Sequence, residues 1–455
     1  MSILHTDITR QFPGRGVASS YARKLLSDLG VNIENTYMPL DRHPADRWRE
    51  SGLMSITGTE KGDPLLCPAP LASCADGALA AFRAVSDKTI LSDLKGAELL
   101  SERAAIVGLG RAGSASPGGS CRLVQTKDGM IAFNLARGSD WEQLPAWLQH
   151  NAQYDWESVI HNVAKWSTRD LLEQGRLLGL AVADTIPTAQ MDSSWLTLSC
   201  TGRKITNRAP TPRVLDLSSL WAGPLCSHLW QLAGADVIKI ESSQRPDGTR
   251  QGPPPFFDLL NQNKQSLELD LHRPHGQRAL LELIHEADIV LEGSRPRALR
   301  QMGIVAEELI EKIPGLTWVS ISGYGRQEPQ ANWIAYGDDA GVAAGLSSIM
   351  HEVTGEWVIC ADAIADPLTG LHAALAGWAN WQSGGGALLD LSLYQTVRHC
   401  LRETDTTNCN LNQRYKQWSQ HLAKNSSTVK RPLSRVAVVS APNLGNDNDR
   451  LLGGT

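Results

Sequence analysis

The stretch RVLDLSSLWAGPLCSHLWQLAGADVIKIE, residues 213–241, decides the fold of this chain. It opens with an apolar strand pattern, Val214–Leu217, and turns through the small residues of Ala222–Pro224 into a helical pattern that ends at Gly234. A second buried strand pattern, Val237–Ile240, follows at once. Strand, helix and strand in this order predict a βαβ unit, which begins a doubly wound α/β sheet.

The composition is that of an ordinary globular protein with room for two or three domains. Its 455 residues are 42% hydrophobic and 20% charged, with a formal net charge of −5. This charge disfavours nucleic acid or an anionic membrane as a partner. The sequence shows no signal-peptide pattern, no apolar run of membrane-spanning length and no CxxC pair. We therefore expect a cytoplasmic protein with reduced thiols and no bound metal.

The chain repeats part of its own sequence. Residues 18–33 resemble residues 222–237, and residues 46–81 align with residues 339–374 without a gap, at a constant offset of 293. The aligned glycine pairs are Gly52 with Gly345, Gly62 with Gly355, and Gly77 with Gly370. Shared glycines in a constant register predict a partial duplication, in which the first copy is degenerate.

These patterns divide the chain into four expected parts. They are a degenerate partial copy of the large domain (1–100), a small α+β domain with a linker (101–205), a Rossmann-like large domain (206–400) and a tail that packs on the large domain (401–455). The fold class that they predict is α/β, with a doubly wound large domain beside a small α+β domain.

The small domain has its own signals. A strand–turn–strand pattern over Cys121–Leu135 surrounds an Asp-Gly turn. Tryptophan-bearing amphipathic patterns follow at Trp141–Leu148 and Trp156–Leu178 and predict two helices. The polar stretch Ser199–Pro212 is typical of a linker into the second half.

Several blocks in the second half occur together in a fixed order. They are LAGADVIKIE (232–241), PDGTR (246–250), NQNKQSLELDL (261–271), ADIVLEGSRPRALRQMGI (287–304), ISGYGRQEP (321–329), ADPLTGLHAAL (365–375) and GGGALLDLSL (384–393). The ordered set resembles the family III CoA-transferases, which include formyl-CoA transferase, carnitine CoA-transferase and the α-methylacyl-CoA racemases. The block at 120–144 is similar to the family's small domain, which normally follows the aspartate motif. The resemblance implies coenzyme A as a substrate, no tightly bound cofactor and a homodimer.

The resemblance also implies a catalytic residue, Asp366, in the motif ADPLTGLH. A carboxylate suits this role because it can attack a thioester carbonyl and form a mixed anhydride, an activated acyl group. Asp366 followed by Pro367 is also a good helix start, so the residue can serve as a cap as well. The repeat places Ser73 opposite Asp366, and the first copy is therefore expected to lack the nucleophile.

The same resemblance implies the residues that bind acyl-CoA. Basic groups are needed because coenzyme A carries phosphates, and small residues allow a backbone to approach the ligand closely. The expected substrate-binding and CoA-binding residues are Ala222, Gly223, Pro224, Arg250, Lys264, Arg295, Arg300, Tyr324, Gly325 and Tyr336. Gly293 and Ser294 stand where the family usually has Asn-Phe, which bears on the contact with adenine.

Two alternatives to a transferase remain at this point. The racemases of the family use a histidine thirty residues before the aspartate, and Tyr336 stands there instead. A tyrosine with an ordinary pKa near 10 is a poor base at neutral pH. The second alternative is a non-catalytic CoA-binding or partner subunit, suggested by the degenerate first copy. A Rossmann dehydrogenase is disfavoured because no GxGxxG motif follows the first strands.

Overall fold

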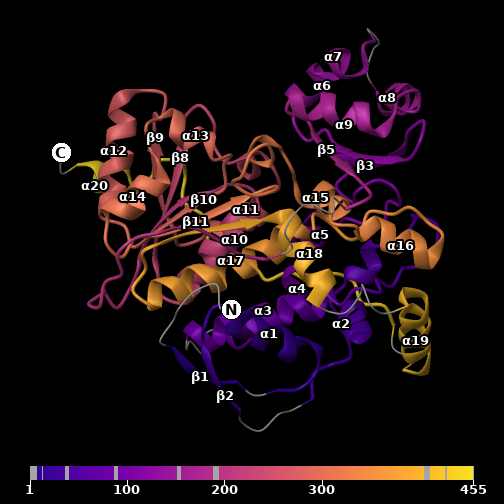
Figure 1. Ribbon diagram of the computed structural model, residues 1–455, viewed down its shortest axis with the longest axis horizontal. Coiled ribbons are helices and arrows are strands. Elements are labelled where there is room, and N and C mark those ends of the chain that lie inside the picture. The colour runs from indigo at the N-terminus through magenta and orange to yellow at the C-terminus, as the bar shows by residue number, and fades with distance from the viewer. Residues whose placement is uncertain are drawn as a thin grey trace.

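The computed structural model describes most of the chain (Figure 1), namely residues 8–12, 14–35, 40–86, 91–150, 155–187, 194–403, 410–425 and 428–453. A seven-stranded sheet with the order β6-β12-β11-β10-β7-β8-β9 is the centre of the second half. All neighbours are parallel except β6, which is antiparallel to β12. The strands are β6 (Thr197–Thr201), β7 (Arg213–Leu217), β8 (Asp236–Ser242), β9 (Gln265–Leu269), β10 (Ile289–Glu292), β11 (Thr317–Ser322) and β12 (Ala387–Ser392).

The βαβ unit predicted from residues 213–241 is confirmed. Strand β7 leads into helix α10 (Ala222–Leu232), and β8 returns parallel to β7 with Val214 opposite Val237. The helix ends where Gly234 adopts a φ of +103°, a left-handed conformation that glycine tolerates at a helix C-terminus. Small residues at the start of α10 are all buried, so the helix packs closely on the sheet.

Helices cover both faces of the sheet, as expected for parallel strands. Alternate residues of β7 point to opposite faces, so that Val214 joins the core cluster of α10 and α17 (Ala365–Gln382). Its neighbour Leu215 joins the cluster of α12 (Pro274–His285) and α14 (Ala306–Lys312). The expectation of a Rossmann-like sheet is met by a mixed, mostly parallel sheet with an antiparallel edge.

The small domain is an antiparallel sheet covered by helices, seen at the upper right of Figure 1. Its strands are β3 (Cys121–Gln125), β4 (Met130–Asn134) and β5 (Ala181–Asp184). Its helices are α6 (Gly138–Glu142), α7 (Leu144–Leu148), α8 (Trp156–Val163) and α9 (Thr168–Leu177). The single helix expected over Trp156–Leu178 is wrong, because the Ser167 side chain accepts the Asp170 amide and starts a new helix.

The linker expected at Ser199–Pro212 is also wrong in part. Its first residues belong to β6, which pairs with β12 and covers what would otherwise be an open sheet edge. The pairing carries a register shift between Leu388 and Leu389, so the strand is short and irregular. A brief polar strand of this kind has the same composition as a loop.

The first half folds onto the large domain. Strand β1 (Thr9–Phe12), helix α1 (Val17–Asp28) and strand β2 (Asn32–Asn35) form a second, short parallel unit. The other helices are α2 (Pro44–Glu50), α3 (Leu71–Ser86), α4 (Gly96–Leu99) and α5 (Glu102–Val107). Helix α3 packs against both α1 and α17, and one apolar core runs through both halves.

The tail touches both halves of the chain. Helix α19 (Leu411–Lys424) packs against α2 and α16 (Leu346–Thr354), whereas α20 (Asn448–Leu452) lies against β9. Between them, Arg435 forms a two-pronged ion pair with Glu102 of the first half. Within the described ranges, none of the helices combines the length and the apolar character needed to cross a bilayer.

Candidate active site

Asp366 lies at the start of the long helix α17 and is half-buried. The loop before it is unusual because two alanines adopt left-handed backbone conformations, Ala361 with a φ of +61° and Ala363 with a φ of +44°. Such conformations cost free energy for residues other than glycine and are concentrated at functional sites. The loop closes by a hydrogen bond of 2.9 Å from the Asp366 amide to the Ala363 carbonyl.

Two further aspartates lie beside Asp366. Asp338 belongs to α15 (Gly337–Ala343) and accepts a hydrogen bond of 2.7 Å from the Ala363 amide. Asp362 is fully buried in the strained loop. The Gly337 amide donates to the Asp366 carboxylate, and a Cβ on Gly337 would lie only 2.3 Å from Asp366 Oδ2. The absence of a side chain at this position makes room for the carboxylate.

Two residues of the first half contact these carboxylates. Arg103 of α5 donates to both oxygens of Asp362, through Nε at 2.8 Å and through Nη2. Ser116, in the loop before β3, hydrogen-bonds to Asp338. Sequence reasoning missed Arg103, Ser116, Asp338 and Asp362, because nothing in their spacing indicates that they meet. The adjacent aspartates Asp338 and Asp339, just after Tyr336, were the one sequence feature that could have indicated further acidic residues in the site.

Burial raises the pKa of Asp366 to about 7, and the charge of Asp338 adds to the effect. Arg103 and the Gly337 amide act in the opposite direction. Burial likewise raises the pKa of Asp338 to about 7, with a further contribution from Asp362. Carboxylates that interact this closely titrate as a set. Asp366 is therefore poised to change charge near neutral pH, as expected of a functional carboxylate.

A second region lies where the strand order reverses between β7 and β10. In doubly wound sheets, ligands bind outside the carboxyl ends of the strands at this switch point. The exposed residues after β7 are Ser219 and Leu220, and Gly293 follows β10. A Cβ on Gly293 would lie 3.1 Å from the Cβ of Ser218, so a larger residue would press the two loops apart.

Arg295 follows the same loop and is half-buried without a carboxylate partner among the described residues. Burial lowers its pKa, and the positive charges of Arg297, Arg137 and Arg245 lower it further. The four arginines come from the ends of β8 and β10 and from the small domain. Arg137 is paired with Asp140, whereas Arg245, Arg295 and Arg297 form no ion pair within the described residues. The resulting excess of positive charge attracts phosphate, which arginine binds in a two-pronged manner. Arg137, Arg245 and Arg297 were not predicted from the sequence.

The other basic residues predicted to meet phosphates are engaged within the protein. Lys264 is fully buried, and its ammonium group lies 3.1 Å from Asp216 and 2.8 Å from the Ser227 hydroxyl. Arg250 forms a two-pronged ion pair with Glu241. Arg300 pairs with a glutamate as well, at 2.7 Å. The predicted turn of Ala222, Gly223 and Pro224 is buried in the first turn of α10, so the exposed backbone lies just before it.

Tyr336 connects the two regions, whereas Tyr324 and Gly325 follow the end of β11. Tyr336 precedes Gly337, and its neighbours include Arg137 and Arg245. Burial raises the pKa of Tyr336 to about 12, so even less tyrosinate is present at neutral pH to act as a base than for an ordinary tyrosine. The buried hydroxyl of Tyr324 has no hydrogen-bond partner among the described residues. The Gly325 amide, at a φ of +98°, is fixed by a hydrogen bond of 2.8 Å to the Ser322 hydroxyl.

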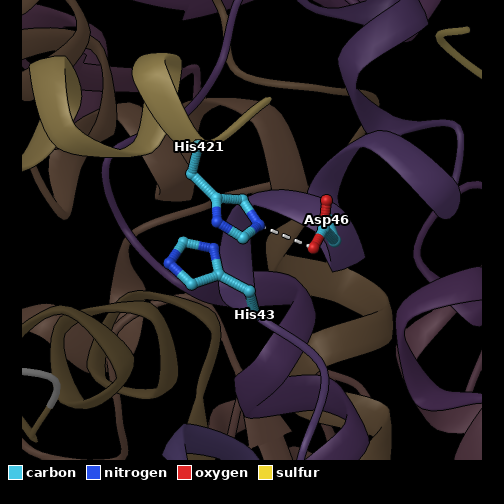
Figure 2. A group of neighbouring side chains, drawn as sticks. All are labelled: His43, Asp46 and His421. Atoms are coloured by element: carbon cyan, nitrogen blue, oxygen red, sulfur yellow. Dashed lines mark hydrogen bonds and ion pairs between the residues drawn. The ribbon is translucent and has the colours of Figure 1, made fainter. Parts of the chain in front are cut away.

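A separate group of possible metal ligands joins α2 to α19 (Figure 2). Ligand atoms of His43, Asp46 and His421 lie within 4.8 Å of one another. However, the two imidazole rings stack at a centroid distance of 3.9 Å, so their in-plane lone pairs do not converge. His421 Nε2 bonds to Asp46 at 2.8 Å, and His43 Nδ1 accepts the Ala45 amide at 3.2 Å. The group is arranged as a contact between helices, away from Asp366.

Part of the chain is similar to known CoA-transferases. Residues 212–429 match the family model "CoA-transferase family III". The chain is 31% identical to succinyl-CoA–D-citramalate CoA-transferase of Chloroflexus aurantiacus, over 42% of this chain and 52% of that protein. It is 32% identical to formyl-CoA:oxalate CoA-transferase of Escherichia coli, over 42% of this chain and 48% of that protein. The chain thus spans about half the length of these relatives.

A solved structure is similar over a comparable stretch. It is a CAIB/BAIF family protein from Brucella suis, with 26% identity and a TM-score of 0.39, covering 50% of this chain and 60% of that chain. The family match contains Asp366, Asp338 and Asp362, whereas Arg103 and Ser116 lie before it. Residues 212–429 are thus the part of the chain that is similar to CoA-transferase family III.

Proposed function

We propose that this protein is a CoA-transferase that moves coenzyme A between an acyl-CoA thioester and a carboxylic acid, with Asp366 as the nucleophile. One observation carries the proposal: the half-buried carboxylate of Asp366 follows a strained loop at the start of a helix and has a raised pKa. The same carboxylate accepts a hydrogen bond from the Gly337 amide. This combination fits covalent catalysis better than a helix cap, which would need neither the strain nor the acidic neighbours.

The proposed reaction forms and breaks its bonds in balance. The Asp366 carboxylate attacks the thioester carbonyl, an acyl–oxygen bond forms, and the carbon–sulfur bond breaks to release CoA thiolate. The acceptor carboxylate then attacks the aspartyl carbonyl of the anhydride and displaces the first acid. Finally, the thiolate attacks the new acyl carbonyl, which yields the new thioester and restores Asp366. The Gly337 amide and the α17 N-terminus stabilise negative charge on the Asp366 carboxylate.

The proposed path of acyl-CoA runs from the arginine group to Asp366. Phosphates would meet Arg295 with Arg137, Arg245 and Arg297, at the carboxyl ends of β8 and β10. The thioester end would pass Tyr336, which neighbours both Arg137 and Gly337. This route uses two residues predicted from the sequence, Arg295 and Tyr336, and adds arginines from the small domain and from β8.

Lys264 has a positioning role in this proposal rather than a direct phosphate contact. Its ammonium group bonds to Asp216 at the end of β7 and to the Pro224 carbonyl of α10, at 3.1 and 3.2 Å. A neighbouring pair, Lys239 and Asp247, lies 2.9 Å apart and reaches the Ser218 carbonyl. These buried charges fix the loop after β7, where the ligand would approach the backbone. Arg250, Arg300, Tyr324 and Gly325 likewise shape the site from within the protein in this proposal.

The proposed site is assembled within one chain. Arg103 and Ser116 of the first half reach Asp362 and Asp338 of the second. The first half would then be a degenerate copy that has become part of the site. Equivalent glycines support this origin: a Cβ on Gly77 would lie 2.5 Å from a carbonyl of α1, and a Cβ on Gly370 would lie 2.6 Å from a carbonyl of α10. A homodimer remains part of the proposal, with one complete site in each chain.

The test is exchange of label between an acid and its own thioester, because this reaction proceeds whatever the second substrate is. Purified protein is incubated with succinyl-CoA, formyl-CoA or acetyl-CoA and the matching ¹³C-labelled acid, and labelled thioester is followed by mass spectrometry. Asp366→Asn should abolish exchange, whereas Asp170→Asn, in the first turn of α9, should not change it. Exchange that survives Asp366→Asn would refute the nucleophile. Coenzyme A binding without exchange would favour the non-catalytic alternative.

A further inference from the structure

The strained loop before Asp366 is held in place by the first half of the chain. The Ala361 amide donates to the Thr57 hydroxyl at 3.1 Å, across 304 residues of sequence. Cys360, just before the loop, hydrogen-bonds to Cys67, which stands at the equivalent position of the repeat. Because the loop is strained, it keeps its conformation only while such contacts determine it.

Arg103 makes the strongest of these contacts. Its guanidinium group donates hydrogen bonds to both carboxylate oxygens of Asp362, whose side chain is fully buried. A buried carboxylate without a cation would carry a large desolvation cost, which the guanidinium group of Arg103 offsets. Gly118 closes over the pair, since a Cβ there would lie 2.9 Å from Arg103 Nη2.

Arg103 is also the cation that acts on the other two aspartates. Its charge favours ionisation of both Asp366 and Asp338, whereas Asp362 and Asp338 oppose the ionisation of Asp366. Although burial opposes the effect, the pKa of Arg103 itself is raised by Asp362. Three carboxylates thus share one guanidinium group, and the balance among them decides how much of Asp366 is ionised at a given pH.

We propose that Arg103 is a positioning residue of the active site: by holding Asp362 and the loop at residues 361–363, it fixes the place of Asp366, and its positive charge favours the carboxylate form. This inference rests on the proposed role of Asp366 as the nucleophile. It gives the first half a function in catalysis, because the cation lies outside the part of the chain that matches the family. Without the first half, Asp366 would face two aspartates without the guanidinium group that offsets them.

The test is the pH profile of the label exchange described above, from about pH 5.5 to 9, measured on the full-length protein. In Arg103→Gln, the midpoint of the rising limb should move upward by about one pH unit, so that exchange falls about tenfold below the midpoint and recovers at high pH. Arg103→Lys should retain most of the wild-type midpoint, because it keeps the charge. A purely structural role would lower exchange equally at every pH.

Arg435 supplies the matched control. It forms the same kind of two-pronged ion pair, at 2.6 and 2.8 Å, with Glu102, the residue next to Arg103. Arg435→Gln should therefore leave the midpoint unchanged. If Arg103→Gln folds poorly, Asp362→Asn tests the same idea. This variant should lower the midpoint of the pH profile, and the double variant Arg103→Gln/Asp362→Asn should return the midpoint toward the wild-type value.

The outcomes separate the two proposals. If Asp366→Asn retains exchange, the nucleophile is wrong and the inference about Arg103 falls with it. If Asp366→Asn abolishes exchange but the midpoint is the same in wild type, Arg103→Gln and Asp362→Asn, only the inference about Arg103 is overturned. A shared midpoint shift in Arg103→Gln and Arg435→Gln would also overturn it, because the effect would then reflect loosening of α5.

Discussion

Replacing Gly337 by alanine should disable the site through one added methyl group. The new Cβ would lie 2.3 Å from Asp366 Oδ2 and 2.3 Å from the Ala363 carbonyl oxygen. An ordinary contact of this kind is about 3.4 Å, so the carboxylate or the loop must move by about 1 Å. The Ala363 carbonyl belongs to the backbone of a strained loop and moves less easily than a side chain. We therefore expect the Asp366 carboxylate to be displaced.

The size of the effect follows from this displacement. A misplacement of about 1 Å at a reacting group can lower a rate about a hundredfold. The cost in stability should be smaller, about 1–3 kcal/mol, as is usual for an overpacked position. We therefore expect Gly337→Ala to lose about two orders of magnitude in label exchange, while the protein still folds and binds coenzyme A.

The assay pairs label exchange with thermal unfolding and coenzyme A binding. Gly341→Ala is the control, because Gly341 lies one turn later in α15 and its added Cβ would meet the nearest side-chain carbon at 3.3 Å. This variant should keep exchange within about threefold of wild type, and the helix gains from alanine. Wild-type exchange in Gly337→Ala would refute the reasoning, because it would show that the position of the Asp366 carboxylate is not critical.

Three further predictions follow from the charges. Asp216→Asn leaves the Lys264 ammonium group buried without its carboxylate and should lower the free energy of unfolding by about 3–5 kcal/mol in urea titration. Arg295→Ala should weaken coenzyme A binding about tenfold by calorimetry, more at low salt, whereas Arg300→Ala should not. Because the folded-state pKa of Asp338, about 7, exceeds the ordinary 3.8, the folded state binds the extra proton, and stability should fall as pH rises from about 4 to 7. Asp338→Asn should remove part of this fall, as measured by the Tm at about pH 5 and pH 8.

The βαβ unit could be predicted from the sequence because its signals are local. An apolar strand pattern, a helical period and the stop at Gly234 each depend on neighbouring residues, and all three were confirmed. Strand β6 and the break between α8 and α9 were missed for the complementary reason. The first depends on an edge of β12 that lies far away in sequence, and the second on a single capping hydroxyl of Ser167.

The site was predictable only where a motif carried it. Asp366 stands in a motif, and Arg295 follows a strand end, so both could be singled out from the sequence. Lys264 was assigned to phosphate by its motif, but its side chain points into the protein and bonds to Asp216. A sequence pattern records which residue type is present, whereas the direction of a side chain depends on tertiary packing. Arg103 lies 259 residues from Asp362, and no local pattern could join them.

The distribution of charge explains why a degenerate first half would persist in this chain. The second half supplies Asp366, the proposed nucleophile, and two buried aspartates, and this arrangement alone disfavours the ionised form of Asp366. The first half supplies the guanidinium group of Arg103 and the hydroxyl groups of Ser116 and Thr57. Under the proposed duplication, in which Ser73 stands opposite Asp366, the first half would still be required, because the proposed nucleophile depends on its side chains.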